Sequence, residues 1–157
     1  MAIMGSSNLR SSTLYDPIRK KWVEKTPEEC IRQLLILHMI EQLGYPPALI
    51  AVERELSSFK GAQEHSAVPK RRVDILVFNK SSAGALTPLL MIECKAVALT
   101  PKFTQQLVGY NSFIGAPFIA LANGKDVLTG HYDGEQYRFQ PGLPHWKTTS
   151  QAIVDYF

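Results

Sequence analysis

The sequence lacks the features of a membrane-spanning, secreted or disulfide-stabilised protein. Its 157 residues contain no apolar stretch long enough to cross a bilayer as a helix. The polar start, Met1 to Ser12, has no apolar core of a signal peptide. The two cysteines, Cys30 and Cys94, lie in separate apolar runs and form no CxxC motif. We therefore expect buried reduced thiols, no sulfur-ligated metal and a cytoplasmic location.

Glycine motifs that bind phosphate and clusters of histidine are also missing. The chain has neither a P-loop nor a GxGxxG fingerprint, so it carries no sign of a helicase engine. Its four histidines are scattered and indicate neither a zinc site nor a catalytic triad. The net charge of +3 permits nucleic-acid binding without demonstrating it.

What is present is the pattern of an α/β domain. Residues 1–14 are polar and serine-rich, and we expect a flexible N-terminal tail there. Residues 15–157 are expected to form a single domain, opening with a short strand or turn near Tyr15. The predicted core order is αβββαβ, a mixed central β-sheet flanked by helices, as in the restriction-endonuclease-like fold.

The boundaries of the predicted elements come from caps, turns and periodicity. Thr26, Pro27 and Glu29 give the first helix a capping box, and apolar residues on most of its sides suggest that it packs between other elements. Four strands, a second helix, two hairpin turns and a short C-terminal helix are then expected, in the order Leu49–Leu56, Arg71–Phe78, Pro88–Val97, Thr100–Ile114, Phe118–Ala122, Asn123–Gly124, Asp133–Gly134 and from Ser150. In the first of these strands Glu53 and Glu55 are expected to face solvent.

Two acids and a lysine interrupt the apolar strands. Asp74 lies in one predicted strand, and Glu93 and Lys95 lie two residues apart in the next, so those two side chains point the same way. Placing the two carboxylates together costs free energy unless a cation joins them. Oxygen ligands, with the backbone carbonyl of Cys94 added, suit Mg²⁺, with Mn²⁺ as a substitute. Lys95 is then expected to orient the attacking water.

These motifs together resemble a known family. Asp74 followed by Glu93-Cys94-Lys95 is similar to the PD-(D/E)xK nuclease signature, although Val73 stands where the family name has proline. With Thr26-Pro27-Glu28-Glu29, Arg32-Gln33, Gly44-Tyr45-Pro46 and Asn123-Gly124, the chain resembles the N-terminal nuclease domain of the type I restriction enzyme motor subunit over residues 15–140. The resemblance implies Mg²⁺-dependent hydrolysis of DNA to 5′-phosphate and 3′-hydroxyl ends.

The same resemblance assigns further site residues. Gln106 and Tyr110 are similar to the Q-x-x-x-Y motif that lies beside the catalytic site in these nucleases, and a buried Gln–Tyr hydrogen bond is the structural alternative. A glutamate of the first helix often approaches the metal. Glu28 is preferred because Glu29 has the capping role, and Arg32 is able to pair with Glu28.

Basic residues and partners complete the hypothesis. Lys70, Arg71 and Arg72 adjoin the Asp74 strand and are candidates for DNA phosphate contacts, although such runs also occur on solvated faces. The expected partners are DNA and a helicase, translocase or other restriction–modification subunit. A dimer is compatible with the sequence, which does not fix the oligomeric state.

Two rival interpretations remain open. In one, the fold serves as a non-catalytic DNA-binding or protein-interaction module. Alternatively, Glu93 and Lys95, or Asp74 and Lys95, form only a structural ion pair.

Overall fold

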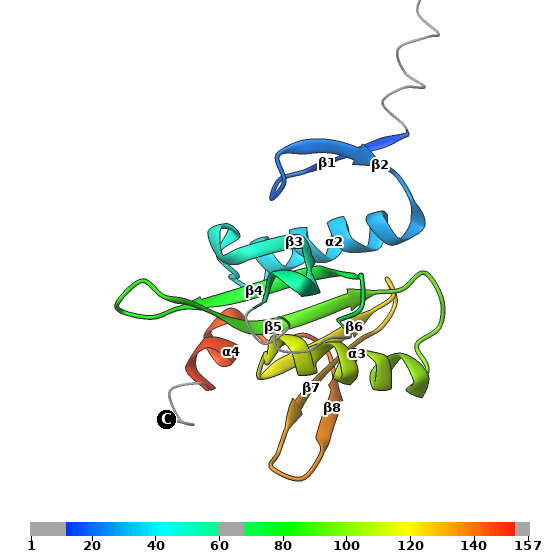
Figure 1. The fold of residues 1–157 in the computed structure, drawn as a ribbon. Coiled ribbons are helices and arrows are strands. Elements are labelled where there is room, and N and C mark those ends of the chain that lie inside the picture. The colour runs from blue at the N-terminus through cyan, green and yellow to red at the C-terminus, as the bar shows by residue number, and fades with distance from the viewer. Residues whose placement is uncertain (1–11, 60–67, 153–157) are drawn as a thin grey trace, which may run out of the picture.

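A computed structural model describes residues 12–59 and 68–152 of the chain (Figure 1). Its elements are β1 (Thr13–Asp16), β2 (Lys21–Glu24), α2 (Pro27–Glu41), η1 (Pro47–Leu49), β3 (Ile50–Glu55), η2 (Leu56–Ser58), β4 (Arg72–Lys80), β5 (Leu86–Cys94), α3 (Pro101–Ile114), β6 (Phe118–Ala122), β7 (Val127–Tyr132), β8 (Tyr137–Pro141) and α4 (Trp146–Ala152). The predicted core order, αβββαβ, is confirmed by α2, β3, β4, β5, α3 and β6.

The strands form a six-stranded mixed sheet in the order β3-β4-β5-β6-β7-β8. Neighbouring strands are antiparallel except β5 and β6, which are parallel. A parallel pair needs a crossover connection, and α3 supplies it. The predicted turns at Asn123-Gly124 and Asp133-Gly134 join β6 to β7 and β7 to β8, which confirms the meander.

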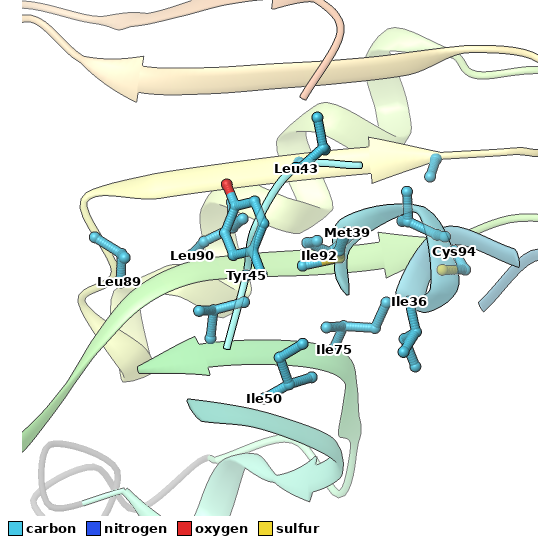
Figure 2. Close-up of a cluster of buried hydrophobic side chains, with 14 residues drawn as sticks. Ile36, Met39, Leu43, Tyr45, Ile50, Ile75, Leu89, Leu90, Ile92 and Cys94 are labelled. Atoms are coloured by element: carbon cyan, nitrogen blue, oxygen red, sulfur yellow. The ribbon is translucent and has the colours of Figure 1, made fainter. Parts of the chain in front are cut away.

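The two long helices cover opposite faces of the sheet, with α2 on one side and α3 on the other (Figure 1). Under α2, the side chains of Ile36 and Met39 are fully buried against Ile75 and Ile92 (Figure 2). Under α3, Leu107 packs with the second cluster, whose sheet residues include Met91, Ile119 and Leu121. Four further apolar or aromatic residues of α3 pack against this second cluster: Phe103, Tyr110, Phe113 and Ile114.

Helix α2 begins as the sequence predicts but is not packed on every side. Thr26 is the N-cap, and its hydroxyl accepts a hydrogen bond from the backbone N–H of Glu29 at 3.1 Å. Leu34 and Leu37 are exposed, with 67% and 48% of their surface accessible. Helix α2 nevertheless contacts both β5 of the sheet and β1 of the N-terminal hairpin, so it does lie between other elements as expected, although these two leucines remain uncovered.

Both ends of the described chain differ from the prediction. Residues 1–11 of the expected tail lie outside the described residues, whereas Thr13 and Leu14 already belong to β1, which pairs with β2 across a turn at Lys20. At the other end, α4 begins at Trp146 rather than near Ser150. The Trp146 ring packs against Tyr45, and the Trp146 backbone N–H donates to the carbonyl of Leu43. No helix among the described residues is long and apolar enough to cross a membrane.

Candidate active site

Asp74 and Glu93 meet where β4 and β5 run side by side. The two strands pair Ile75 with Ile92, and one further step along the antiparallel register places Asp74 opposite Glu93. Burial raises the pKa of Glu93 to about 8, and repulsion from the Asp74 carboxylate adds to the effect. The two acids are therefore close enough to repel each other, as expected of a pair that shares a cation.

The Asp74 carboxylate is held by two donors at hydrogen-bond distance. The Arg32 guanidinium donates to Oδ1 at 2.7 Å, and the backbone N–H of Cys94 donates to Oδ2 at 2.7 Å. Cys94 follows Glu93, so this second bond fixes Asp74 to the strand that carries the other acid. Each carboxylate oxygen of Asp74 thus accepts a hydrogen bond, and the two bonds fix the orientation of the carboxylate group.

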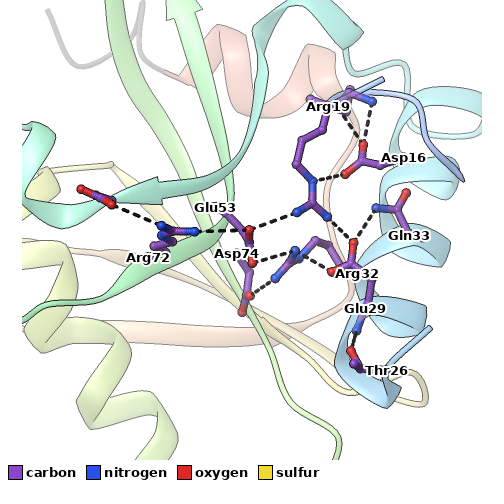
Figure 3. A network of polar contacts seen from close by, with 11 residues as sticks. Asp16, Arg19, Thr26, Glu29, Arg32, Gln33, Glu53, Arg72 and Asp74 are labelled. Atoms are coloured by element: carbon purple, nitrogen blue, oxygen red, sulfur yellow. Dashed lines mark hydrogen bonds and ion pairs between the residues drawn. The ribbon is translucent and has the colours of Figure 1, made fainter. Parts of the chain in front are cut away.

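Arg32 is the centre of a network of charges that reaches the N-terminal hairpin (Figure 3). Its guanidinium pairs with Glu29 at 2.7 Å and Glu53 at 3.5 Å in addition to Asp74. Arg19, in the turn between β1 and β2, pairs with Asp16, Glu29 and Glu53. Burial opposes the charge of Arg32, but its bond to Asp74 and the surrounding carboxylates raise its pKa above the usual value. Sequence reasoning missed this network, which joins four segments of the chain.

Glu53 and Glu29 have different roles from those expected. Glu53 was expected to face solvent, yet its carboxylate accepts a hydrogen bond from Arg19 at 3.0 Å. Its backbone has a φ of +55°, a region that costs free energy for a non-glycine residue. Glu29 does not complete the capping box, because its carboxylate bonds to Arg19, Arg32 and Gln33 instead. These corrections share one cause, since both acids are drawn to arginines from other segments.

Glu28, the preferred helix acid, is exposed near the N-terminus of α2. It does not pair with Arg32, which instead contacts Glu29, Glu53 and Asp74. Burial, the charge of Asp74 and a smaller contribution from Glu28 raise the pKa of the Cys94 thiol. Glu28 is therefore near enough for its charge to act at the site. Cys30 and Cys94 are both free thiols, but only Cys94 is buried, so the expectation of buried thiols is wrong for Cys30, which is partly exposed.

The Glu93 carboxylate faces a different arginine. Glu93 is 4% exposed, and its Oε2 accepts from an Arg71 N–H at 3.4 Å. The Arg71 guanidinium also lies over the Tyr110 ring, 4.7 Å from its centre. Arg71 thereby joins the strand acid to the tyrosine of the predicted Q-x-x-x-Y pair. With Lys70 and Arg72 it lines a pocket of about 760 Å³.

Lys95 lies one residue beyond the end of β5, which the sequence predicted to continue to Val97. Its backbone N–H still donates to the Ala122 carbonyl at 2.8 Å, so the strand pairing extends to this residue. Its ammonium group lies 4.9 Å from the centre of the Phe103 ring. Within the described parts of the chain, no ion pair links Lys95 to Asp74 or Glu93. The lysine ion pair of the rival interpretation is therefore not formed, and two arginines occupy the carboxylates instead.

Helix α3 contributes a half-buried Gln106 and a half-buried Tyr110 to this side of the sheet. The alternative Gln–Tyr hydrogen bond is not formed between them, because Gln106 makes no side-chain hydrogen bond to any described residue. Sequence reasoning missed Asn111, whose buried amide bonds to the Ala116 carbonyl at 2.8 Å and the Tyr137 hydroxyl at 3.1 Å. Asn111 fixes the end of α3 to β8.

The donor set consists of oxygen atoms, the ligand type that a hard divalent cation prefers. Two carboxylates that repel each other are brought together, and a backbone carbonyl at Cys94 lies between Glu93 and Lys95 in sequence. No group of three or more His, Cys, Asp or Glu side chains is placed to hold a metal within residues 12–59 and 68–152. A protein site of this kind leaves several coordination positions to water or phosphate, which is the usual mode for Mg²⁺.

Comparisons with known proteins agree with the fold and with the family resemblance. Residues 27–144 match the model of the family described as type I restriction enzyme R protein N terminus. The structure is similar to a fragment described as an HsdR subunit of a type I restriction enzyme from Vibrio vulnificus YJ016. The TM-score is 0.58 and the identity 16%, over 83% of this chain and 26% of the other. The chain thus spans about a quarter of that structure. No curated protein matches the sequence significantly.

Proposed function

Since the chain belongs to the family of type I restriction enzyme R protein N termini, we propose that it is a Mg²⁺-dependent DNA nuclease domain. The observation that carries this proposal is the meeting of Asp74 and Glu93, with Lys95 at the end of the same strand. The proposed reaction is hydrolysis of a phosphodiester bond in DNA. Restriction of foreign DNA is the corresponding biological role.

In this proposal each side chain has a distinct task. Asp74 and Glu93 hold the cation together with the Cys94 carbonyl, and Mn²⁺ is able to replace Mg²⁺. A cation held by these groups would polarise a phosphoryl oxygen and lower the pKa of bound water. Lys95 orients the attacking water and stabilises the negative charge that develops on the phosphate. Its ammonium group rests on Phe103 and pairs with no carboxylate of the described residues, so it is available for this role.

The surrounding residues support the strand and the site. Lys70, Arg71 and Arg72 contact DNA phosphates from the pocket that they line. Tyr110 and Gln106 support the site from α3, the tyrosine through its contact with Arg71. Glu28 acts through its charge from the start of α2. The partners would be DNA and a translocase or other restriction–modification subunits, in the cytoplasm.

One observation favours a second candidate function. Both carboxylates already have arginine partners, at 2.7 Å for Asp74 and 3.4 Å for Glu93. A domain whose acids are neutralised in this way is able to bind DNA through its basic pocket without cutting it. This candidate is a DNA-binding module on the same fold.

A cleavage assay on supercoiled and linear DNA separates the two functions. With Mg²⁺ the wild-type chain should cut DNA, and without Mg²⁺ it should not. Asp74→Ala should abolish cleavage and Mn²⁺ binding together, and Lys95→Ala should abolish cleavage while Mn²⁺ binding remains. If the wild-type chain leaves DNA intact and Asp74→Ala keeps its full DNA affinity, the nuclease proposal fails and the binding module stands.

A further inference from the structure

Arg71 has more hydrogen-bonding capacity than its surroundings use. A guanidinium carries five N–H donors in a rigid fork. In this structure one of them faces Glu93 at 3.4 Å, at the long end of a hydrogen bond. Its Nε–H is buried and has no hydrogen-bond partner among the described residues, which is also true of the Arg32 Nε–H, so the two arginines differ only in their other contacts. Arg71 is thus held loosely, which contrasts with the short bonds of Arg32 to Glu29 and Asp74.

Arg71 also borders a basic pocket, which is a second environment for its guanidinium. The pocket of about 760 Å³ is lined by Lys70, Arg71 and Arg72, with Glu55 as its acidic member. The side chain of Arg71 is 37% exposed, whereas that of Glu93 is 5% exposed. Glu93 therefore stays inside while the guanidinium borders solvent. A planar fork of donors matches the geometry of a phosphate.

We infer that Arg71 is an exchangeable counter-ion, which holds Glu93 when no cation is bound and contacts a DNA phosphate when a cation is bound. The inference rests on the proposed metal site. A divalent cation carries twice the charge of the guanidinium, so it takes over Glu93 and repels Arg71. The contact with the Tyr110 ring does not depend on Glu93, and it keeps Arg71 near the pocket.

The consequence is a coupling between cation and DNA. Cation binding frees an arginine for DNA, and DNA binding removes a competitor of the cation from Glu93. Because coupling free energies are reciprocal, each ligand strengthens the other by the same factor. Tyr110 is then a positioning residue for Arg71, a task that the Q-x-x-x-Y pattern alone does not indicate.

The test is DNA affinity with and without a cation. Fluorescence anisotropy of a labelled duplex gives the affinity of the full chain in EDTA and in Ca²⁺, at constant ionic strength because salt alone changes it. A gel of each sample verifies that the duplex is intact. Titration with Mn²⁺, followed by the electron spin resonance of the free ion, measures the cation site separately.

The wild-type chain should bind DNA about tenfold more tightly in Ca²⁺ than in EDTA, within the usual range of such couplings. In Arg71→Ala the ratio of the DNA affinity in Ca²⁺ to that in EDTA should fall below about twofold. Mn²⁺ binding without DNA should strengthen severalfold, because Arg71 no longer competes with the cation for Glu93. Arg72→Ala is the matched control. Arg72 lines the same pocket but pairs with Glu53 and Glu55, so its removal should weaken DNA binding equally in both conditions and keep the ratio.

Variants of Tyr110 provide an independent check that leaves Arg71 in place. Tyr110→Phe keeps the ring face and should keep the ratio, whereas Tyr110→Leu removes the ring and should lower it. If Arg71→Ala binds Mn²⁺ and keeps the wild-type ratio, the exchange is refuted while the metal site stands. If the wild-type chain binds no Mn²⁺, the proposed nuclease and the exchange both fall.

Discussion

The two acids of the candidate site are neutralised in opposite ways. Asp74 is bound to Arg32 and to the Cys94 backbone, both at 2.7 Å, within a network of short contacts that includes Glu29 and Arg19. Glu93 is more deeply buried, yet its single ion pair among the described residues is a long one with a partly exposed Arg71. Burial thus does not predict how firmly a charge is held. Here the number and length of its hydrogen bonds decide.

This difference assigns different physical roles to the two sides. The Asp74 side is built into the fold, because its partners come from β1–β2, α2, β3 and β5 and fix these segments to one another. At Glu93, burial and the repulsion from Asp74 both raise the pKa of the carboxyl group, and Arg71 offsets them only in part. A site that stores unfavourable charge at one residue, supported by a rigid neighbour, is suited to binding a cation. Four substitutions test whether the two sides differ as much as their contacts suggest.

Arg32→Ala should have the largest effect. Its removal leaves Asp74 and Glu29 inside the protein without their central counter-charge, so we expect a loss of about 3–5 kcal/mol in the free energy of unfolding. Urea denaturation measures this loss. Arg138→Ala is the control, because Arg138 pairs with Asp133 on the surface and should change stability by less than about 1 kcal/mol. Equal effects of the two substitutions would show that the Arg32 network has no special weight.

Arg19→Ala should come next, with a loss of about 1.5–3 kcal/mol. Asp16 is fully buried, and Arg19 and two backbone N–H groups hold its pKa below the usual value against the effect of burial. Without Arg19 the hairpin loses its connection to Glu29 and Glu53. Hydrogen exchange should therefore speed up in β1 and β2 more than in β4 and β5. Uniform protection across these four strands would contradict a separate linking role for Arg19.

The comparison also shows which parts of the site the sequence was able to predict. Local signals predicted the helix cap at Thr26, the turns at Asn123 and Asp133 and the alternating strands, and the structure confirms them. The Asp74, Glu93 and Lys95 pattern was visible because these residues interrupt apolar strands at fixed spacing. Such signals depend on residues a few positions apart, so a single sequence contains them.

The arginine network was not visible for the opposite reason. Arg19 and Glu53 are 34 positions apart, and Arg32 and Asp74 are 42 positions apart. Helical spacing suggested a pair between Arg32 and Glu28, and a capping box suggested a different task for Glu29. Tertiary contacts overrode both local preferences. The positive φ of Glu53 is part of the same outcome, because no local pattern predicts a strained residue that is held by long-range ion pairs.

Glu93→Gln should raise the stability of the metal-free chain. The pKa of Glu93 is raised from 4.5 to about 8, so the folded chain binds more protons than the unfolded chain between these values. The free energy of unfolding of the metal-free chain therefore falls as the pH rises through this window. Glutamine does not ionise, so the Glu93→Gln chain should not show this fall. Each unit of pKa shift corresponds to about 1.4 kcal/mol, and we expect a gain of at least about 1 kcal/mol above the raised pKa. Mn²⁺ binding should disappear in the same variant.

The control for this gain is Glu55→Gln, since Glu55 is exposed and pairs only with Arg72 among the described residues. Its stability should stay within about 0.5 kcal/mol of wild type at every pH. Thermal or urea unfolding in EDTA, repeated across the pH range, measures both variants. A Glu93→Gln chain that is less stable than wild type would mean that the acid is well accommodated without a cation, and the fit of the site to a metal would lose its main physical support.

Arg71→Ala should have the smallest effect on stability, less than about 1 kcal/mol in EDTA near neutral pH. Its guanidinium is partly exposed and contributes a single long ion pair among the described residues. The same urea experiment that measures Arg32→Ala measures this variant. A small loss of stability in Arg71→Ala and a large loss in Arg32→Ala would establish that Arg32 is part of the fold and that Arg71 is free to bind a ligand. A loss at Arg71 as large as that at Arg32 would instead place both arginines in the fold.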